Sequence, residues 1–140
     1  MNSVIERLTQ ALGSAQIRSG DSLSERATSY WNGEPTCTTA IVFPRTTDEV
    51  SQIMMICQSS SQAVVLQGGL TGCVSGAVSQ KEEVILSVEK MNTIESVETI
   101  GSTATVQAGV ILEVLKNNLA DQGLIFPLDI RSKRQLYHRR

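Results

Sequence analysis

Two short apolar runs that flank one clearly marked helix restrict the possible folds of this chain more than any other feature. The runs are TAIVF at Thr39–Phe43, which Pro44 ends, and AVVL at Ala63–Leu66. Between them, Thr46 and Glu49 have the spacing of a capping box, which predicts that a helix begins here. The apolar residues that follow recur at i, i+3, i+4 and i+7 and predict one buried stripe: Val50, Ile53, Met54 and Cys57.

The order strand, helix, strand with short connections predicts a right-handed βαβ unit with parallel strands. The run Ala63–Leu66 shows no polar alternation, which is typical of a strand covered on both faces. We therefore expect it to be the central strand of the unit. A third strand is expected at Val84–Val88, which reads VILSV.

The second half of the chain predicts a separate, antiparallel layer. Thr93–Ala108 reads as two strands around a turn at Gly101–Ser102, and a helix is expected at Val110–Asp121 with Gly123 beyond its end. At the other terminus, Ser3 and Glu6 form a second capping box ahead of a short amphipathic helix. The predicted fold class is therefore α+β: a small parallel βαβ unit with a Gly-rich loop, followed by the start of an antiparallel sheet.

The overall composition excludes several classes of function. With 140 residues, 41% hydrophobic, 19% charged and a net charge of −2, the chain has the size and balance of one ordinary domain without a basic surface for nucleic acid. It contains no apolar run of the ~20 residues that a membrane span needs, and its N-terminus does not have the pattern of a secretory leader. Three scattered cysteines and a single histidine, His138, predict no metal site and a reducing, cytoplasmic location.

A cluster of glycines follows the second apolar run. The stretch Val64–Val78 reads VVLQGGLTGCVSGAV and places four glycines within nine residues. Such a cluster marks a tight turn, a close packing contact, or a loop whose amides approach a ligand. It would leave the carboxyl end of a parallel strand, where open α/β sheets bind ligands, and successive N–H groups there can bind an anion. The loop fits neither a Walker A motif nor G-x-G-x-x-G, so its residues alone leave a ligand site and a structural turn open.

Five segments, taken in order, resemble one known family. They are AIVFPRTTDEVSQIM, VVLQGGLTGCVSGAV, VILSVEKMNTIESV, VQAGVILEVL and LIFPLDI. They are similar to the FAD-binding (PCMH-type) domain of vanillyl-alcohol-oxidase-type flavoproteins, and most of all to its D-lactate and D-2-hydroxyglutarate dehydrogenase branch. The resemblance runs from about Asp21 to Ile130 and implies a division into an N-terminal helix and extension (1–38), a partial FAD-binding domain (39–130) and an aberrant tail (131–140).

The resemblance implies FAD as the cofactor and assigns the residues that would bind it. In the family the glycine loop wraps the FAD diphosphate through backbone amides, with the hydroxyl of Thr71 as an extra donor. A segment near Pro127 lies against the flavin. Carried over by position, the cofactor-binding residues are Gly68, Gly69, Leu70, Thr71, Gly72, Gly76, Ala77, Pro127 and Asp129.

The sequence also departs from the branch within this loop. Leu70 stands where a small or polar residue is usual, and Ser75 and Ala77 stand where glycine is usual. Each adds a Cβ at a position that can require positive φ. Members that attach flavin covalently often use a histidine in or near the loop, and this loop has none, so the expected FAD is non-covalent.

The tail after Lys133 departs from the branch altogether. Where relatives continue with glycine-rich sequence, this chain reads RQLYHRR at Arg134–Arg140. Permitted codons for these residues are AGG CAG CTG TAC CAT CGG CGG, and without the leading A they read Gly-Ser-Cys-Thr-Ile-Gly-Gly, as the branch does. The tail is therefore interpreted as a frameshift product of a truncated chain.

The frameshift interpretation predicts the DNA beyond the codon for Lys133. Read one base further along, it should encode Gly-Ser-Cys-Thr-Ile-Gly-Gly and then a long open frame. Sequencing of the gene checks this. A stop codon at once in that frame, or unrelated sequence, would contradict the interpretation.

Three functional hypotheses remain at this point. The chain is the N-terminal part of an FAD-dependent oxidoreductase of D-2-hydroxy acids, without the substrate domain and inactive alone. Alternatively, it is a module that binds another phosphate compound, or an inert truncated product. The resemblance favours the first, with FAD as partner and a 2-hydroxy acid as substrate only of the full-length form, and with no catalytic residue in this chain.

Overall fold

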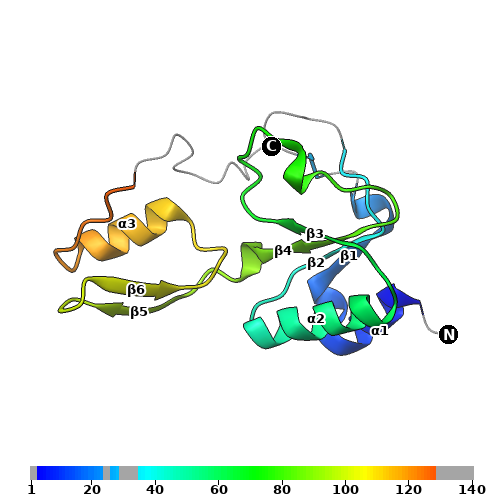
Figure 1. Cartoon of the computed structure of the whole chain (residues 1–140), viewed down its shortest axis with the longest axis horizontal. Coiled ribbons are helices and arrows are strands. Elements are labelled where there is room, and N and C mark those ends of the chain that lie inside the picture. The colour runs from blue at the N-terminus through cyan, green and yellow to red at the C-terminus, as the bar shows by residue number, and fades with distance from the viewer. Residues whose placement is uncertain (1–2, 24–25, 29–34, 129–140) are drawn as a thin grey trace.

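A computed structural model describes residues 3–23, 26–28 and 35–128 of the chain. Figure 1 shows two parts side by side, a four-stranded sheet with its helices and a hairpin with one helix. The elements are α1 (Val4–Leu12), η1 (Ser14–Gln16), β1 (Ile17–Ser19), η2 (Gly20–Leu23), β2 (Ala40–Val42), α2 (Thr47–Ser59), β3 (Val64–Gln67), η3 (Ser75–Ala77), β4 (Val84–Ser87), η4 (Val88–Lys90), β5 (Ile94–Glu98), β6 (Thr103–Val106) and α3 (Leu112–Ala120), where η denotes a 3-10 helix.

The four-stranded sheet has the order β1-β2-β4-β3, in which β2, β4 and β3 are parallel and β1 is antiparallel to β2. The prediction of parallel strands joined by a helix is confirmed. The prediction that Ala63–Leu66 forms the central strand is wrong, because β4 lies between β2 and β3 and leaves β3 at the edge. Leu66 is accordingly 63% exposed, whereas every residue of β4 is buried.

Helix α2 begins as the sequence predicts, with one difference in its cap. The Thr46 hydroxyl accepts a hydrogen bond from the Glu49 N–H at 3.2 Å, but the Glu49 carboxylate accepts from the Arg45 N–H at 2.6 Å. Ile53 is buried, while Met54 is 47% exposed, so the predicted place of Met54 on the buried stripe is wrong. Successive residues of a helix are rotated by about 100° around its axis. Because the buried stripe is centred on Ile53, Met54 lies towards the solvent side.

Two apolar clusters cover the two faces of the sheet. Helices α1 and α2 pack on one face, where Cys57 is buried, and burial raises the pKa of its thiol although the charge of Arg7 opposes the shift. On the other face, the segment that begins at η2 places Leu23 on the sheet. The buried members of the first cluster are Leu8, Val42, Ile53, Cys57, Val84 and Leu86, and those of the second are Leu23, Ile41, Phe43 and Ile85.

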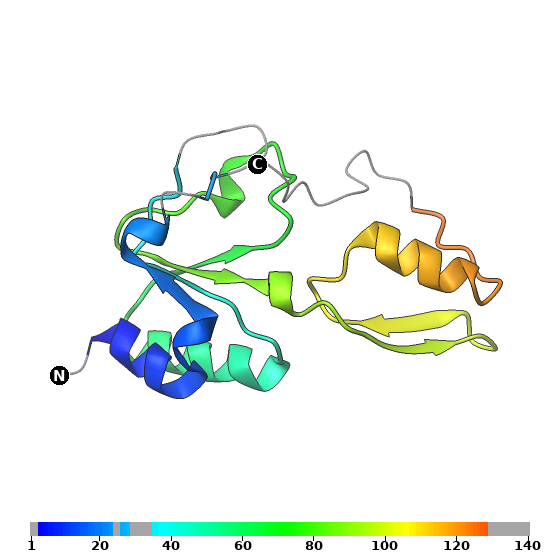
Figure 2. The ribbon, with the colours of Figure 1, turned by 180° about the vertical axis from the view of Figure 1, so that it is seen from behind.

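The predicted hairpin and third helix are confirmed. Strands β5 and β6 form a separate two-stranded antiparallel sheet, and α3 lies beside it, as Figures 1 and 2 both show. The α3 helix spans Leu112–Ala120, slightly less than predicted, because Ile111 has the extended backbone of an N-cap residue. The fold class is α+β, as expected.

Gly109 joins the hairpin to the rest of the molecule. It is buried after β6, and its N–H donates a hydrogen bond to the Met91 carbonyl at 2.8 Å. A Cβ at this position would lie 2.0 Å from the Val88 carbonyl oxygen and 2.9 Å from that of Met91. Only glycine allows the chain to pass this close to η4.

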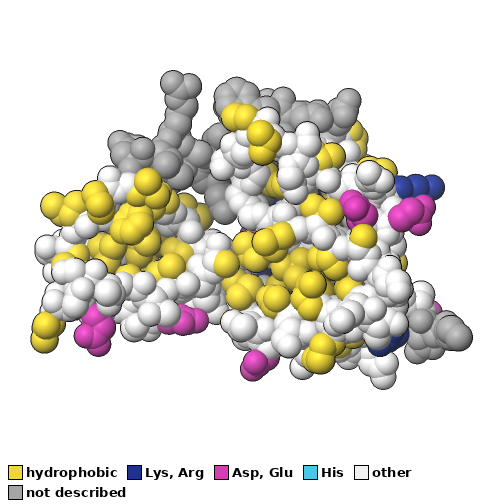
Figure 3. All heavy atoms as spheres, in the orientation of Figure 1, with side chains coloured by type: hydrophobic (Ala, Val, Ile, Leu, Met, Phe, Trp, Pro, Cys, Tyr) yellow, Lys and Arg dark blue, Asp and Glu magenta, His cyan; other side chains and the backbone are white. Residues whose placement is uncertain are grey.

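Apolar side chains also reach the surface. Figure 3 shows one group over the hairpin and α3, and a second between β3 and α2. Val114 of α3 is an exposed residue beside the hairpin, and Met54 of α2 and Leu66 of β3 are exposed residues of the four-stranded part. The apolar surface is therefore present on both parts of the molecule.

Candidate functional site

The glycine-rich loop connects edge strand β3 to the central strand β4. It leaves the carboxyl end of β3 at Gly68, passes through η3 and returns as an extended segment. Thr71–Gly76 is exposed along its whole length, while Gly68–Leu70 and Ala77 are half-buried. The loop therefore presents its main chain to solvent at the edge of the sheet where parallel strands end, which is the usual ligand edge of such sheets.

The φ angles and the space around each glycine show whether the fold itself requires glycines in this loop. Gly72 and Gly76 do not have positive φ, and among the described residues no atom lies within 4 Å of a Cβ built on either. At Gly68 a Cβ would lie 3.8 Å from Cγ2 of Val88, an ordinary contact. Neither a special turn nor close packing requires glycine at these three positions. Of the three reasons that the sequence left open, close approach of a ligand to the main chain is the one that these observations do not test.

Leu70 is the strained residue of the loop. Its φ is 56°, in the left-handed region that non-glycine residues rarely adopt. An L side chain in this conformation costs roughly 1–2 kcal/mol, a cost that glycine avoids. The loop keeps its path at Leu70 in spite of this cost.

We expect β-branching at this position to be costly. Leu70→Ile keeps the atoms of the side chain but adds a branch at Cβ, so it should lower the free energy of unfolding by about 1 kcal/mol. Leu66→Ile is the matched control: Leu66 is exposed on an extended strand, which favours β-branched residues, and no loss is expected. Urea unfolding of both variants measures the difference. Equal stabilities would mean that the loop does not hold Leu70 at positive φ in solution.

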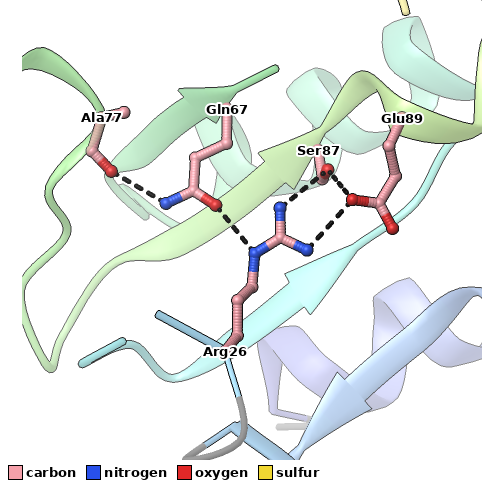
Figure 4. Close-up of polar contacts among 5 residues, drawn as sticks. All are labelled: Arg26, Gln67, Ala77, Ser87 and Glu89. Atoms are coloured by element: carbon pink, nitrogen blue, oxygen red, sulfur yellow. Dashed lines mark hydrogen bonds and ion pairs between the residues drawn. The ribbon is translucent and has the colours of Figure 1, made fainter. Parts of the chain in front are cut away.

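A buried polar network lies at the base of the loop (Figure 4). Arg26 Nε donates to Gln67 Oε1 at 3.2 Å, and Gln67 Nε2 donates to the Ala77 carbonyl at 2.8 Å. Arg26 Nη1 pairs with Glu89 Oε2 at 3.0 Å, and Nη2 donates to Ser87 Oγ at 3.3 Å. The network ties both ends of the loop to the carboxyl ends of β3 and β4.

The charges in this network balance each other. The side chains of Arg26 and Glu89 are only 10% and 16% exposed and form an ion pair. The guanidinium also lies over the Phe43 ring, 5.9 Å from its centroid, while Arg18 lies 5.3 Å from the same centroid. The charge of Arg26 is therefore compensated by Glu89 within the network.

The sequence analysis missed this network. Gln67 immediately precedes the glycines inside an apolar strand, which marks it as a buried polar residue that needs a partner. Arg26 lies in a polar stretch to which the sequence assigns no element, and no periodic pattern connects it to a strand 41 positions away.

The predicted binding residues are brought together only in part. Gly68, Gly69, Leu70, Thr71, Gly72, Gly76 and Ala77 share the one loop. Pro127 is exposed, and segment 124–128 lies beside α3, away from the loop in Figures 1 and 2. Asp129 and the tail 131–140 lie outside the described residues. Within the described part of the chain, no group of His, Cys, Asp and Glu could hold a metal ion.

None of the helices in the described residues is long and apolar enough to cross a membrane. The predicted cytoplasmic location is a separate question, since the names of several relatives carry the word mitochondrial.

Solved structures share the fold. A structure of alkyldihydroxyacetonephosphate synthase superimposes with a TM-score of 0.79 at 18% identity, over 91% of this chain and 26% of that one. p-Cresol methylhydroxylase superimposes with a TM-score of 0.71 at 21% identity, over 86% of this chain and 24% of that one.

Relatives in sequence cover the same region. The D-2-hydroxyglutarate dehydrogenase of Arabidopsis thaliana is 44% identical over 93 residues, which are 66% of this chain and 17% of that protein. The D-2-hydroxyglutarate dehydrogenase of Xanthomonas citri pv. viticola is 35% identical over 106 residues, 76% of this chain and 22% of that protein. The chain thus spans about a fifth of these relatives or less.

The sequence model of one family, described as FAD binding domain, matches residues 38–136. This match covers more than half of the chain and includes the whole glycine-rich loop with both strands that hold it. The cofactor that the resemblance implied, FAD, is the one that this family's domain binds. The chain belongs to the FAD-binding domain family.

Proposed function

We propose that the loop from Gly68 to Ala77 holds the diphosphate of FAD through backbone N–H groups and without a covalent bond. The observation that carries this proposal is the open space at Gly72 and Gly76, where nothing in the described fold requires glycine. A ligand whose oxygens contact the main chain supplies the missing reason. The exposed Thr71 hydroxyl is a further donor on the same stretch.

The electrostatics of the loop suit a dinucleotide better than a free, highly charged anion. The nearby guanidinium is paired with Glu89, and Lys81 is exposed beyond the end of the loop. Neutral N–H donors, each worth about 1 kcal/mol net, would bind the diphosphate with little help from a cation. Affinity must then come largely from the rest of the ligand, as in a cofactor with two large ring systems.

The longer protein to which this chain corresponds is proposed to be an FAD-dependent oxidoreductase of D-2-hydroxy acids. Support comes from relatives named as D-2-hydroxyglutarate dehydrogenases, of which this chain covers 17–22%. Bound FAD would accept the hydride that the hydroxy acid loses. This chain would contribute the diphosphate cradle, and we expect no turnover from the 140 residues by themselves.

A second candidate is a module that binds another diphosphate compound through the same loop. The observation that favours it is that segment 124–128, in which the resemblance places a flavin contact, lies beside α3 and away from the loop in Figures 1 and 2. The two candidates differ in whether the isoalloxazine ring adds affinity.

The cellular location of the protein also stays a prediction. The cysteines favour the cytoplasm, whereas plant and fish relatives carry mitochondrial names.

A titration with FAD, ADP and riboflavin tests the proposal. A handful of amide hydrogen bonds offsets little more than the ~4–15 kcal/mol cost of association, so we expect the 140-residue chain to purify colourless and to bind FAD no tighter than about 10 µM. Flavin fluorescence, with ADP as competitor, gives the affinities. FAD should bind more tightly than ADP, and riboflavin should bind least. Equal affinity for ADP and FAD would favour the second candidate, and no binding of either would contradict both.

A further inference from the structure

We propose that Arg26 is a positioning residue for the FAD loop, which acts by fixing the side-chain amide of Gln67. This inference rests on the proposed function of the loop. Arg26 lies outside residues 38–136, the part of the chain that the family match covers. The structure therefore assigns a role in the cofactor site to the N-terminal extension.

The first step is the contact between Gln67 and the returning limb of the loop. Gln67 is fully buried at the carboxyl end of β3, and its Nε2 donates to the Ala77 carbonyl at 2.8 Å. This hydrogen bond joins the start of the loop to its end, ten residues later. It thereby limits how far η3 and the exposed glycines can move relative to the sheet.

The second step is the orientation of the Gln67 amide. A glutamine amide can present either its oxygen or its nitrogen to a given neighbour. Arg26 Nε donates to Gln67 Oε1 at 3.2 Å, and because a guanidinium only donates, it selects the orientation in which the NH2 group faces Ala77. Without this donor, only the Ala77 carbonyl, which can only accept, favours this orientation, and the buried Oε1 loses the partner that Arg26 gives it.

The third step is the position of Arg26 itself. Its main-chain N–H donates to the Leu23 carbonyl at 3.2 Å, and its carbonyl accepts from the Thr36 N–H at 2.8 Å. The other guanidinium nitrogens contact Glu89 and Ser87, and the group lies over the Phe43 ring. These contacts come from the carboxyl ends of β2 and β4, so the planar fork spans the three parallel strands at the ligand edge (Figure 4).

The arrangement predicts what the loop gains from Arg26. The loop amides would be held in place before the ligand arrives, so that less conformational entropy is lost on binding. Lysine cannot replace this function, since an ammonium group lacks the planar fork that reaches Gln67, Ser87 and Glu89 together. The effect is mechanical rather than a direct attraction, because the Arg26 charge is already paired with Glu89.

The test combines backbone dynamics with FAD affinity in the full 140-residue chain. The variants are Arg26→Met, Arg26→Lys and Gln67→Met. The control is Arg18→Met, an arginine over the same Phe43 ring. Nitrogen-15 relaxation gives order parameters for Ser75–Val78, and flavin fluorescence gives the Kd for FAD. We expect the order parameters to fall from about 0.85 towards 0.6 in the first three variants only, with a Kd about tenfold higher.

The two readouts separate the possible failures. Unchanged order parameters at Ser75–Val78 in Arg26→Lys and Gln67→Met would overturn the positioning role, even if Arg26→Met unfolds and gives no spectrum. A second outcome is that these variants lose order at Ser75–Val78 but the wild-type chain binds no FAD. This result would contradict the proposed function and leave the positioning role intact. A merely structural role would lower the melting temperature without a selective loss of order in this segment. The double variant of Arg26→Met and Gln67→Met should bind FAD no worse than either single variant.

Discussion

Gly109→Ala should lower the free energy of unfolding by about 3 kcal/mol, at the upper end of the usual cost of overpacking. The added Cβ would lie 2.0 Å from the Val88 carbonyl oxygen, a backbone atom that has no alternative rotamer. To accommodate it, the chain must break the Gly109 N–H bond to Met91 or displace η4. Since η4 carries Glu89, the displacement should reach the Arg26 network as well.

Gly101→Ala is the matched control for this substitution. Gly101 lies in the exposed turn between β5 and β6, and its added Cβ would make only an ordinary contact, 3.8 Å from Thr103 Oγ1. Its expected change is within about 0.5 kcal/mol. Urea unfolding followed by circular dichroism measures both variants. If Gly109→Ala proves as stable as Gly101→Ala, the close approach of the hairpin to η4 is contradicted.

Gly72→Val should have the opposite profile, with little effect on stability and a large effect on FAD. No described atom lies within 4 Å of a Cβ at Gly72, and its φ is not positive, so the folded chain can accept the side chain. The same side chain would occupy the space in which diphosphate oxygens approach the main chain. We expect FAD affinity to fall by at least about tenfold, or 1.4 kcal/mol, with a change in unfolding free energy of about 0.5 kcal/mol or less.

Gly76→Val tests the second limb of the loop in the same way, and Gly101→Val supplies a valine far from it. Fluorescence titration with FAD compares the three variants with the wild type. If Gly72→Val and Gly76→Val both retained wild-type affinity, the diphosphate would have to bind elsewhere. A loss of stability in Gly72→Val would instead show that the residue packs more closely in solution.

Local signals in the sequence account for most of the elements. The capping residues Ser3 and Thr46 mark the starts of α1 and α2, and Gly13 marks the end of the first. The hairpin follows from alternation around Gly101–Ser102. The edge position of β3 does not follow, because strand order depends on where β4 inserts. No local pattern reports that choice, and the apolar run AVVL looks the same in either place.

The glycine loop was predictable as a candidate site, whereas its supports were not. Clustered glycines identify the loop, but only the backbone separates Gly72, which has open space, from Gly109, which has two carbonyl oxygens in contact range. The positive φ of Leu70 also needed coordinates. Arg26 and Gln67 are brought together by the tertiary fold alone, so their spacing in the sequence does not predict the hydrogen bond between them.

The most direct test of the central claim is a set of ¹H–¹⁵N spectra of the chain recorded with FAD, ADP and riboflavin. If the loop amides hold the diphosphate, the resonances of Gly68–Gly72, Gly76 and Ala77 should shift with FAD and with ADP. Riboflavin, which has no phosphate, should leave them in place, and the amides of β5 and β6 should stay unchanged with FAD. Loop resonances that do not respond to FAD, or that respond equally to riboflavin, would contradict the account.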